Sequence, residues 1–496
     1  MKKSIFGILL MLESIFLAFT TLVALYYHYR WGETDWKAFA LTTAITFVSG
    51  FLLASYGHTR MGRSTKELSR GGSFTIVGLT WVVFSFFGML PFLFYEGLDV
   101  DIASAYFETM SGFSTMGATT IPDIEAMPHG ILLWRSLTQW MGGLGIVVIS
   151  FALLPTKEMR NSTMFIAEMS GLTINRLQPK IGATSRRLLL IYLVLTIVCT
   201  LMFWVGPMNL YDSVCFALST IATGGFGTHT ASIGYFHSSY IEYVCATFMI
   251  ISSLNFGIFY YLSILKGREC MKNEEVKAFL FTVMGLVTIF CLLFRFSTFN
   301  GSVAIPHTGE GIFRTSLFHV ATIISSSGFQ AESFDYVGWG TAFWMPTVAM
   351  MILGGCTVST SGGMKMMRVL IYLKYALREF KVHLHPHAVI SIKFNGKVIS
   401  ERHIRRVISY LIIYVFILII SCALLTMFGN FDLTTAFGAV VSSFGNTGPA
   451  LGSLGPANNF AAVPAAGKWL FSFLMLVGRL EIFTVLFLFM PKAWKI

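Results

Sequence analysis

Long apolar runs alternate with short polar segments along almost the whole chain, and this pattern predicts membrane-crossing helices. A helix needs about 20 apolar residues to cross the hydrocarbon core of a bilayer. Runs of this kind cover residues 4–28, 37–56, 73–95, 130–154, 187–206, 239–265, 277–298, 338–374, 407–428 and 467–490. The first two runs form a leading hairpin, and the remaining runs form four pairs.

A shorter apolar stretch lies between the two members of each pair. Residues 103–113 and 213–222 are examples, and stretches of about 10 to 12 residues suit re-entrant helices rather than spans. We therefore predict an all-α polytopic membrane protein with four helix–pore helix–loop–helix repeats around a central pore. The predicted boundaries are 1–70 for the N-terminal hairpin and 71–160, 161–270, 271–380 and 381–496 for the repeats, the third with a broken last helix.

Each short stretch leads into a loop centred on one glycine. The four copies begin with a hydroxyl residue and reach their glycine six positions later, at Gly117, Gly225, Gly328 and Gly448. These glycines lie 108, 103 and 120 residues apart, and such internal repetition indicates repeated structure. Non-helical backbone at membrane depth is tolerated only where protein or water surrounds it, so the loops must face one another. Because glycine tolerates unusual dihedrals, we expect a ring of backbone carbonyls around an ion path.

The direction of the short helices indicates the sign of the ion. Each helix ends at its loop, so the negative end of its dipole points toward the predicted centre. A cation is stabilised there, whereas an anion path needs the opposite direction.

Composition agrees with a membrane protein and argues against an enzyme. The chain has 496 residues, of which 55% are hydrophobic and 12% charged, and its mean hydropathy is +0.70. Its seven cysteines are scattered through apolar segments without paired spacing, which indicates neither a zinc site nor a disulfide framework. A membrane enzyme needs His, Asp, Glu or Cys clustered at one depth, and we find no such cluster in the sequence.

The charge distribution predicts the orientation of the chain. The net charge is +11, and 28 of the 35 Lys and Arg residues fall in the segments 2–3, 60–70, 157–187, 266–277, 365–406 and 492–495. The positive-inside rule places these segments, and both termini, in the cytoplasm. Because cations recur on the same side of each repeat, the repeats are parallel, which disfavours a carrier with inverted repeats. Residues 96–125 instead carry six carboxylates, Glu108 among them, and no Lys or Arg, which predicts an acidic outer mouth.

Four segments carry more specific motifs. They are Ser219–Phe226 followed by Ala231–Phe236, Gly354–Lys365, Trp134–Gly145 and Gly445–Pro449. Together they resemble the Trk, Ktr and HKT superfamily of potassium transporters, and within it the TrkH branch. The resemblance covers nearly the whole chain, and the leading hairpin fits the TrkH branch better than the shorter Ktr subunits.

The resemblance implies a potassium filter made by one triplet from each loop. The triplets are Thr115, Met116 and Gly117; Thr223, Gly224 and Gly225; Ser326, Ser327 and Gly328; and Asn446, Thr447 and Gly448. Relatives that favour sodium often have serine at the first glycine, so Gly117 argues for potassium. The residues after the glycines differ from the potassium-channel sequence TVGYG, and we expect fewer well-formed ion sites than in a tetrameric channel. The alternative is that these glycines serve only close packing or tight turns.

The apolar span 338–374 is interrupted by small and hydroxyl residues. Each glycine weakens a helix by about 1 kcal/mol relative to alanine, so a break at membrane depth is expected. The resemblance implies that this segment lies beneath the filter and gates the path through Gly354, Gly355, Thr357, Ser359, Thr360, Ser361, Gly362, Gly363 and Lys365. A cytoplasmic turn without a gating role is the alternative.

Arg479 stands alone near the middle of the last apolar run, with Glu481 two residues later. A charge at that depth needs a partner or water. The resemblance places this arginine just below the filter, where it narrows the path and sets an electrostatic barrier to cations. A structural ion pair or carbonyl contact without effect on transport is the alternative.

The sequence therefore favours a potassium-conducting uptake protein of a bacterial or archaeal inner membrane. A sodium or non-selective monovalent cation transporter, a cation–proton coupled carrier and a sensory or scaffolding membrane protein are the alternatives. The resemblance implies a homodimer on a cytosolic, nucleotide-binding TrkA-like ring that docks on basic inner segments such as 374–406. Potassium is then the transported ion, membrane lipid surrounds the chain, and we expect neither a nucleotide bound by this chain nor a nucleic-acid partner.

Overall fold

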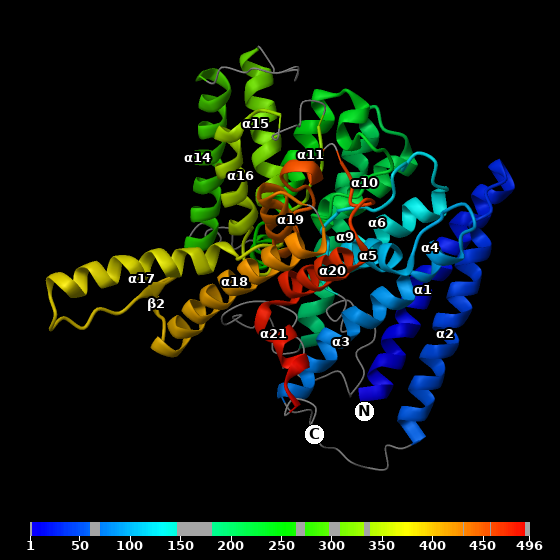
Figure 1. The fold of residues 1–496 in the computed structure, drawn as a ribbon, viewed down its shortest axis with the longest axis horizontal. Coiled ribbons are helices and arrows are strands. Elements are labelled where there is room, and N and C mark those ends of the chain that lie inside the picture. The colour runs from blue at the N-terminus through cyan, green and yellow to red at the C-terminus, as the bar shows by residue number, and fades with distance from the viewer. Residues whose placement is uncertain are drawn as a thin grey trace.

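Helices make up most of this protein (Figure 1). The structure is a computed structural model that describes residues 2–59, 70–145, 181–263, 273–296, 308–331, 338–429, 431–456 and 458–491. Among these residues, six helices are long and apolar enough to cross a membrane, or seven if a bent pair counts as one span. The predicted class, an all-α polytopic membrane protein, is confirmed.

The leading hairpin consists of α1 (Lys2–Trp31) and α2 (Trp36–Thr59), which pack against each other. α1 also packs on α3 and α6 of the first repeat. Glu33, in the hairpin turn, accepts the backbone N–H of His129 at 3.0 Å and lies 2.6 Å from its ring Nδ1. The turn therefore satisfies a free N–H group at the start of α6.

The rest of the chain repeats one arrangement of a first helix, a short helix and a second helix. The first helices are α3 (Arg70–Gly88), extended by α4 (Leu90–Phe94), α9 (Ile181–Val205), α14 (Glu274–Phe296) and α18 (Glu401–Phe428). The short helices are α5 (Ile102–Phe113), α10 (Leu210–Ala222), α15 (Gly309–Ile324) and α19 (Leu433–Gly445). The second helices begin as α6 (His129–Leu144), α11 (Ser239–Ser252), α16 (Thr341–Leu353) and α20 (Ala465–Leu480). Short 3-10 helices, η1 (Ser232–Phe236) and η2 (Gly452–Leu454), follow the second and fourth loops.

Each short helix packs against the first helix of its own repeat and against two second helices. Each packs against the second helix of its own repeat, and the second helix of one repeat also packs against the short helix of the next. The second set of contacts joins α6 to α10, α11 to α15, α16 to α19 and α20 to α5. Since the last contact returns to the first repeat, these helices form a closed ring.

The second helices end or break after 13 to 16 residues, and only the break in the third was predicted. α6 ends at Gly145, which has a φ of 90°. Ser253–Asn255 separate α11 from α12 (Phe256–Ser263), and residues 354–365 separate α16 from α17 (Met366–Leu384). Glu481, with a φ of 72°, separates α20 from α21 (Ile482–Leu486), and the chain bends there by 119° before η3 (Phe487–Phe489). The apolar runs 239–265 and 467–490, predicted as crossings, are therefore interrupted rather than single helices.

One helix reaches away from the rest of the molecule. α17 projects to one side in Figure 1, and the chain returns through a small hairpin of β1 (Lys393–Phe394) and β2 (Lys397–Val398) before α18. Asn395 and Gly396 form the hairpin turn with φ values of 50° and 74°. An Asn-Gly pair with positive φ is typical of two-residue hairpin turns.

Candidate functional site

The four short helices end in the same unusual turn. The first residues of the four triplets, Thr115, Thr223, Ser326 and Asn446, have φ values of 58°, 54°, 58° and 52°. Non-glycine residues seldom adopt positive φ, so the same conformation at four equivalent positions reflects one repeated structure. The glycines that close the triplets also have positive φ, between 76° and 98°.

The repeated hydroxyl residue closes each turn. The second residue of every triplet donates its N–H to the carbonyl oxygen of the hydroxyl residue five positions earlier. These bonds join Met116 to Ser111, Gly224 to Ser219, Ser327 to Thr322 and Thr447 to Ser442 at 2.8–2.9 Å. In three of the loops the hydroxyl group of this residue also donates to a carbonyl oxygen on the far side of the loop. These bonds join Ser111 to Ala118 at 2.6 Å, Thr322 to Phe329 at 2.9 Å and Ser442 to Gly448 at 2.9 Å. The hydroxyl pattern in the sequence thus encodes the loop conformation.

The four loops meet in a ring, and only glycine fits where they touch. A Cβ atom added to the last glycine of each triplet would lie 2.0–2.6 Å from a carbonyl oxygen of another loop. The contacts run from Gly117 to Gly224, from Gly225 to Ser327, from Gly328 to Thr447 and from Gly448 to Met116. Since each contact leads to the next loop and the last returns to the first, all twelve predicted triplet residues lie in one ring.

The ring contains carbonyl oxygens that no donor in the described part of the chain engages. They belong to the first and third residues of three triplets, namely Thr115, Gly117, Thr223, Gly225, Ser326 and Gly328. A buried carbonyl without a partner is costly, and a desolvated cation satisfies several at once. The fourth triplet differs, because Gly448 already accepts the hydroxyl of Ser442.

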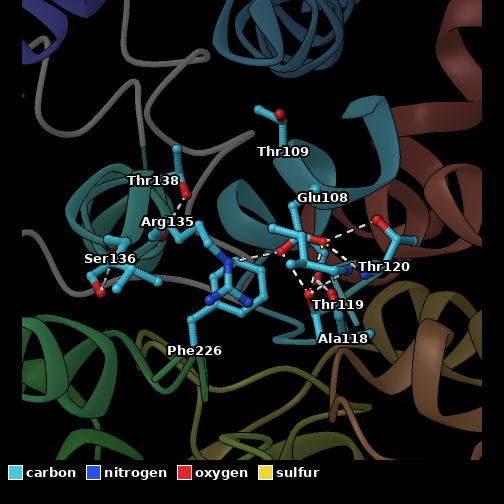
Figure 2. Close-up of polar contacts among 12 residues, drawn as sticks. Glu108, Thr109, Ala118, Thr119, Thr120, Arg135, Ser136, Thr138 and Phe226 are labelled. Atoms are coloured by element: carbon cyan, nitrogen blue, oxygen red, sulfur yellow. Dashed lines mark hydrogen bonds and ion pairs between the residues drawn. The ribbon is translucent and has the colours of Figure 1, made fainter. Parts of the chain in front are cut away.

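A buried ion pair supports the first two loops (Figure 2). Arg135 Nε on α6 donates to Glu108 Oε1 on α5 at 2.8 Å, and the side chains are only 1% and 2% exposed. Glu108 also accepts the N–H of Thr120, just after the first loop, at 2.8 Å. On the other side, Arg135 Nη1 donates to the carbonyl oxygen of Gly227 at 3.1 Å, and the guanidinium lies 4.1 Å from the ring centroid of Phe226. The prediction that Glu108 belongs to an acidic outer mouth is therefore wrong.

One helical turn further along α6, Gln139 holds the second loop directly. Its Nε2 donates to the carbonyl oxygen of Gly224 at 2.6 Å, and its Oε1 accepts the N–H of Phe226 at 3.1 Å. In the sequence, the segment Trp134–Gly145 served only as a family marker, and the roles of Arg135 and Gln139 were not predicted. Polar residues four apart in an apolar membrane helix share one face and need protein partners, and that signal was available.

The segment between α16 and α17 lies against the third and fourth loops. The N–H of Gly362 donates to Ser326 Oγ, and a Cβ on Gly362 would lie 2.2 Å from the carbonyl oxygen of Gly445. The segment also packs on itself, because a Cβ on Gly354 would lie 2.3 Å from the carbonyl oxygen of Gly362. We call residues 354–365 the intramembrane loop.

Hydroxyl groups hold the intramembrane loop in this compact shape. Ser361 Oγ accepts the N–H of Gly355 at 3.1 Å and lies 2.9 Å from Ser359 Oγ. Thr360 Oγ1 donates to the carbonyl oxygen of Ser252 at 3.2 Å, at the break between α11 and α12. A Cβ on Gly363 would lie 2.7 Å from the Cα of Gly354, so the loop has little space for larger residues.

Arg479 connects the intramembrane loop to α6. Its guanidinium donates to the carbonyl oxygen of Thr360 and, at 2.7 Å each, to those of Gly142 and Gly143. The contact with carbonyl oxygens was the structural alternative for this residue, and it joins the loop to the end of a helix that supports the ring.

A cavity beside the loop carries an excess of positive charge. Its lining includes the side chains of Lys365, Arg368, Arg479 and Glu481. Arg368 pairs with Glu481 and lies 4.2 Å from the ring centroid of Tyr410. Lys365 donates to the carbonyl oxygen of Ser361. Three cationic side chains thus share this lining with the single carboxylate of Glu481.

Comparisons with known proteins agree with this geometry. Residues 38–496 match the family model TrkH, described as cation transport protein. The chain is 35% identical to the Trk system potassium uptake protein TrkH of Salmonella typhimurium, over 99% of this chain and 98% of the relative. It is 30% identical to the Trk system potassium uptake protein TrkG of Escherichia coli K12, over 91% of each. The crystal structure of the potassium transporter TrkH from Vibrio parahaemolyticus superposes with a TM-score of 0.85 at 31% identity, covering 99% of both chains.

Proposed function

Since the chain belongs to the TrkH family of cation transport proteins, we propose that it takes up potassium through the ring of four loops. Members of this family are transporters rather than enzymes, and this chain is a multi-pass membrane protein of that family. Potassium is favoured because relatives matched over 91–99% of this chain carry the name potassium uptake protein. The filter consists of the four triplets.

The closed ring of glycine–carbonyl contacts is the observation that carries the proposal. It brings loops that are 103 to 120 residues apart in sequence to one place. Carbonyl oxygens of the first and third triplet residues replace part of the hydration shell of the ion. Because Gly448 uses its oxygen for Ser442, the fourth quarter offers fewer oxygens than the others. This asymmetry supports fewer ion sites than in a symmetric tetramer.

The intramembrane loop is the gate in this proposal, and Arg479 fastens it. The loop touches the third and fourth triplets, and Arg479 binds both the loop and α6. Lys365 and Arg479 place positive charge at the cavity beside the loop, which opposes passage of a cation. Conduction therefore requires the loop and this charge to move aside.

The positive-inside rule supports cytoplasmic termini, because most basic segments lie on one side of the predicted membrane. A membrane potential then drives potassium inward with roughly 2.3 kcal/mol per charge per 100 mV. The basic surface of α17 and of the hairpin β1–β2 is the docking surface we propose for a cytosolic TrkA-like ring beneath a homodimer. No nucleotide site in this chain is part of the proposal.

Flux into proteoliposomes tests the filter. Potassium uptake down its gradient, without ATP, is expected for the wild type. The same flux is expected for Gly285→Ala, because a Cβ at that position meets nothing within 4 Å. Gly225→Val is expected to abolish the flux, since its Cβ would lie 2.0 Å from the oxygen of Ser327. Undiminished flux in Gly225→Val would overturn the assignment of the filter.

Two further arms test the ion and the gate. Equal flux in matched sodium gradients would favour the non-selective alternative. Deletion of Thr357–Ser361 should raise the resting leak, because it removes the middle of the intramembrane loop. A leak equal to that of the wild type would exclude the loop as the gate.

A further inference from the structure

The middle of the intramembrane loop is held by a carboxylate from another part of the chain. Glu275 Oε1 accepts the N–H of Thr357 at 2.6 Å, and Oε2 accepts its hydroxyl at 2.7 Å. Both side chains are buried, with exposures of 2% for Glu275 and 6% for Thr357. Hydrogen bonds to an ionised acceptor are roughly twice as strong as neutral ones, so this two-point contact fixes the position of Thr357.

Glu275 belongs to the first turn of α14, where a carboxylate is favourable. Its N–H donates to Oδ1 of Asn273 at 3.0 Å, and the positive end of the helix dipole lies at this turn. The intramembrane loop approaches the turn from outside the helix and supplies two donors. The carboxylate therefore does not belong to the ring or to the cavity, and no step of the proposed conduction uses it.

The same turn is attached to the cytoplasmic hairpin. The N–H of Glu274 donates to Oδ1 of Asn395 at 2.7 Å, and the carboxylate of Glu274 pairs with the ammonium of Lys374. Lys374 lies on α17 and also donates to the carbonyl oxygen of Lys393 at 2.8 Å. Adjacent residues of one helical turn thus bind the intramembrane loop on one side and α17 with its hairpin on the other.

These contacts connect the intramembrane loop, α17, the hairpin and the start of α14 in a closed series. The intramembrane loop ends at Lys365, and α17 begins at the next residue. α17 leads to the hairpin, the hairpin contacts Glu274, and Glu275 returns to Thr357 in the loop. A displacement of α17 therefore acts on the loop at both its end and its middle.

We propose that Glu275 is the positioning residue that latches the intramembrane loop shut, and that the hairpin β1–β2 is the handle that releases it. The inference rests on the proposed gating role of the loop. When a bound partner displaces the hairpin, Glu274 moves with it. The adjacent carboxylate of Glu275 is then withdrawn from Thr357, and the middle of the loop is released.

The test measures resting potassium leak through the full-length protein in proteoliposomes. Glu275→Gln keeps the size of the side chain, removes its charge and presents an amide donor to the two donors of Thr357. We expect the closed-to-open ratio to fall about tenfold or more, in line with the contribution of hydrogen bonds to charged groups. Glu379→Gln is the matched control, because its carboxyl lies on the outer part of α17 and contacts Arg378 rather than the loop.

Cys356 provides a readout of loop release that a general loss of stability does not mimic. It is fully buried next to Thr357, and its N–H donates to the carbonyl oxygen of Ser253 at 2.9 Å. Labelling with a charged thiol reagent, followed by peptide mass spectrometry, should increase at Cys356 in Glu275→Gln. Labelling of buried Cys215 should stay as low as in the wild type, which shows that the fold is intact.

Asn395→Gly gives a second test at an exposed site. It removes the Oδ1 contact with Glu274, and glycine retains the positive φ of the turn. A raised leak and raised Cys356 labelling are expected, both smaller than in Glu275→Gln. The latch is overturned if deletion of Thr357–Ser361 raises the leak while Glu275→Gln and Asn395→Gly leave leak and labelling unchanged. If the deletion itself leaves the leak unchanged, the proposed gating role of the intramembrane loop is rejected, and the latch with it.

Discussion

Arg135 Nε lies 2.8 Å from Glu108 Oε1, and this buried ion pair joins α6 to α5 (Figure 2). The guanidinium binds Glu108 on one side and Gly227 on the other. The first two quarters of the ring therefore share one support. A displacement of the Arg135–Glu108 pair is therefore expected to shift both loops together.

Removing one partner of this pair should be more harmful than removing both. Arg135→Met leaves a buried carboxylate without its cation, and breaking a buried pair in this way costs about 3–5 kcal/mol. The double variant Glu108→Gln with Arg135→Met removes both charges and should recover part of that loss. Thermal unfolding in detergent gives the stability, and the potassium-to-sodium flux ratio reports the loops. Equal stability of the single and double variants would contradict the pair as a shared support.

Gly117→Ser should disturb the second loop as well as the first. The added Cβ would lie 2.0 Å from the carbonyl oxygen of Gly224, and the residue would have to keep a φ of 82°. Positive φ alone costs a non-glycine residue about 1–2 kcal/mol, or roughly tenfold in an equilibrium. We expect potassium selectivity to fall by about that factor in paired potassium and sodium flux assays. Gly309→Ala, where a Cβ meets nothing within 4 Å, should behave as the wild type.

Arg479→Ala should raise the resting leak, because it frees the carbonyl oxygens of Thr360, Gly142 and Gly143 together. Arg479→Lys keeps the charge, yet an ammonium lacks the planar fork that reaches separate acceptors. It should give a leak between those of the wild type and Arg479→Ala. Size-exclusion profiles in detergent separate this effect from misfolding. A monodisperse Arg479→Ala protein with a wild-type leak would support the purely structural alternative.

Asp35 predicts a dependence of stability on pH. It lies in the turn between α1 and α2 beside Gly130, and burial, followed by the nearby charge of Glu33, raises its pKa from 3.8 to about 6. The folded state thus binds the proton more tightly than the unfolded chain, so this group reduces stability as pH rises from 3.8 to about 6. Asp35→Asn should remove that part of the slope in thermal unfolding measured across the same range. Parallel curves for both proteins would contradict the buried acid.

Much of this architecture could be predicted from the sequence because it depends on local signals. The short apolar stretch 103–113 matches α5 (Ile102–Phe113), since its length and the glycine loop after it are both visible in sequence. The hydroxyl residue six positions before each glycine also proved informative, because its carbonyl closes the turn. The predicted boundaries of the repeats stay a prediction.

The remaining features depend on partners that are distant in sequence. Nothing around Glu108 indicates that its partner is Arg135, and an acidic segment without cations suggested an exposed surface instead. The break at Glu481 lies in an apolar run, and Arg368, 113 residues earlier, pairs with its side chain. The contact of Glu275 with Thr357 could not be predicted for the same reason, because the two residues are 82 positions apart.

A ring assembled from one polypeptide has an evolutionary consequence that a ring of identical subunits does not share. A substitution in a homotetramer appears at all four corners, so its effect on an ion is multiplied. Here each corner can change alone, as the hydroxyl that occupies the oxygen of Gly448 in a single quarter illustrates. Selectivity in such a molecule can be adjusted in small steps, one corner at a time.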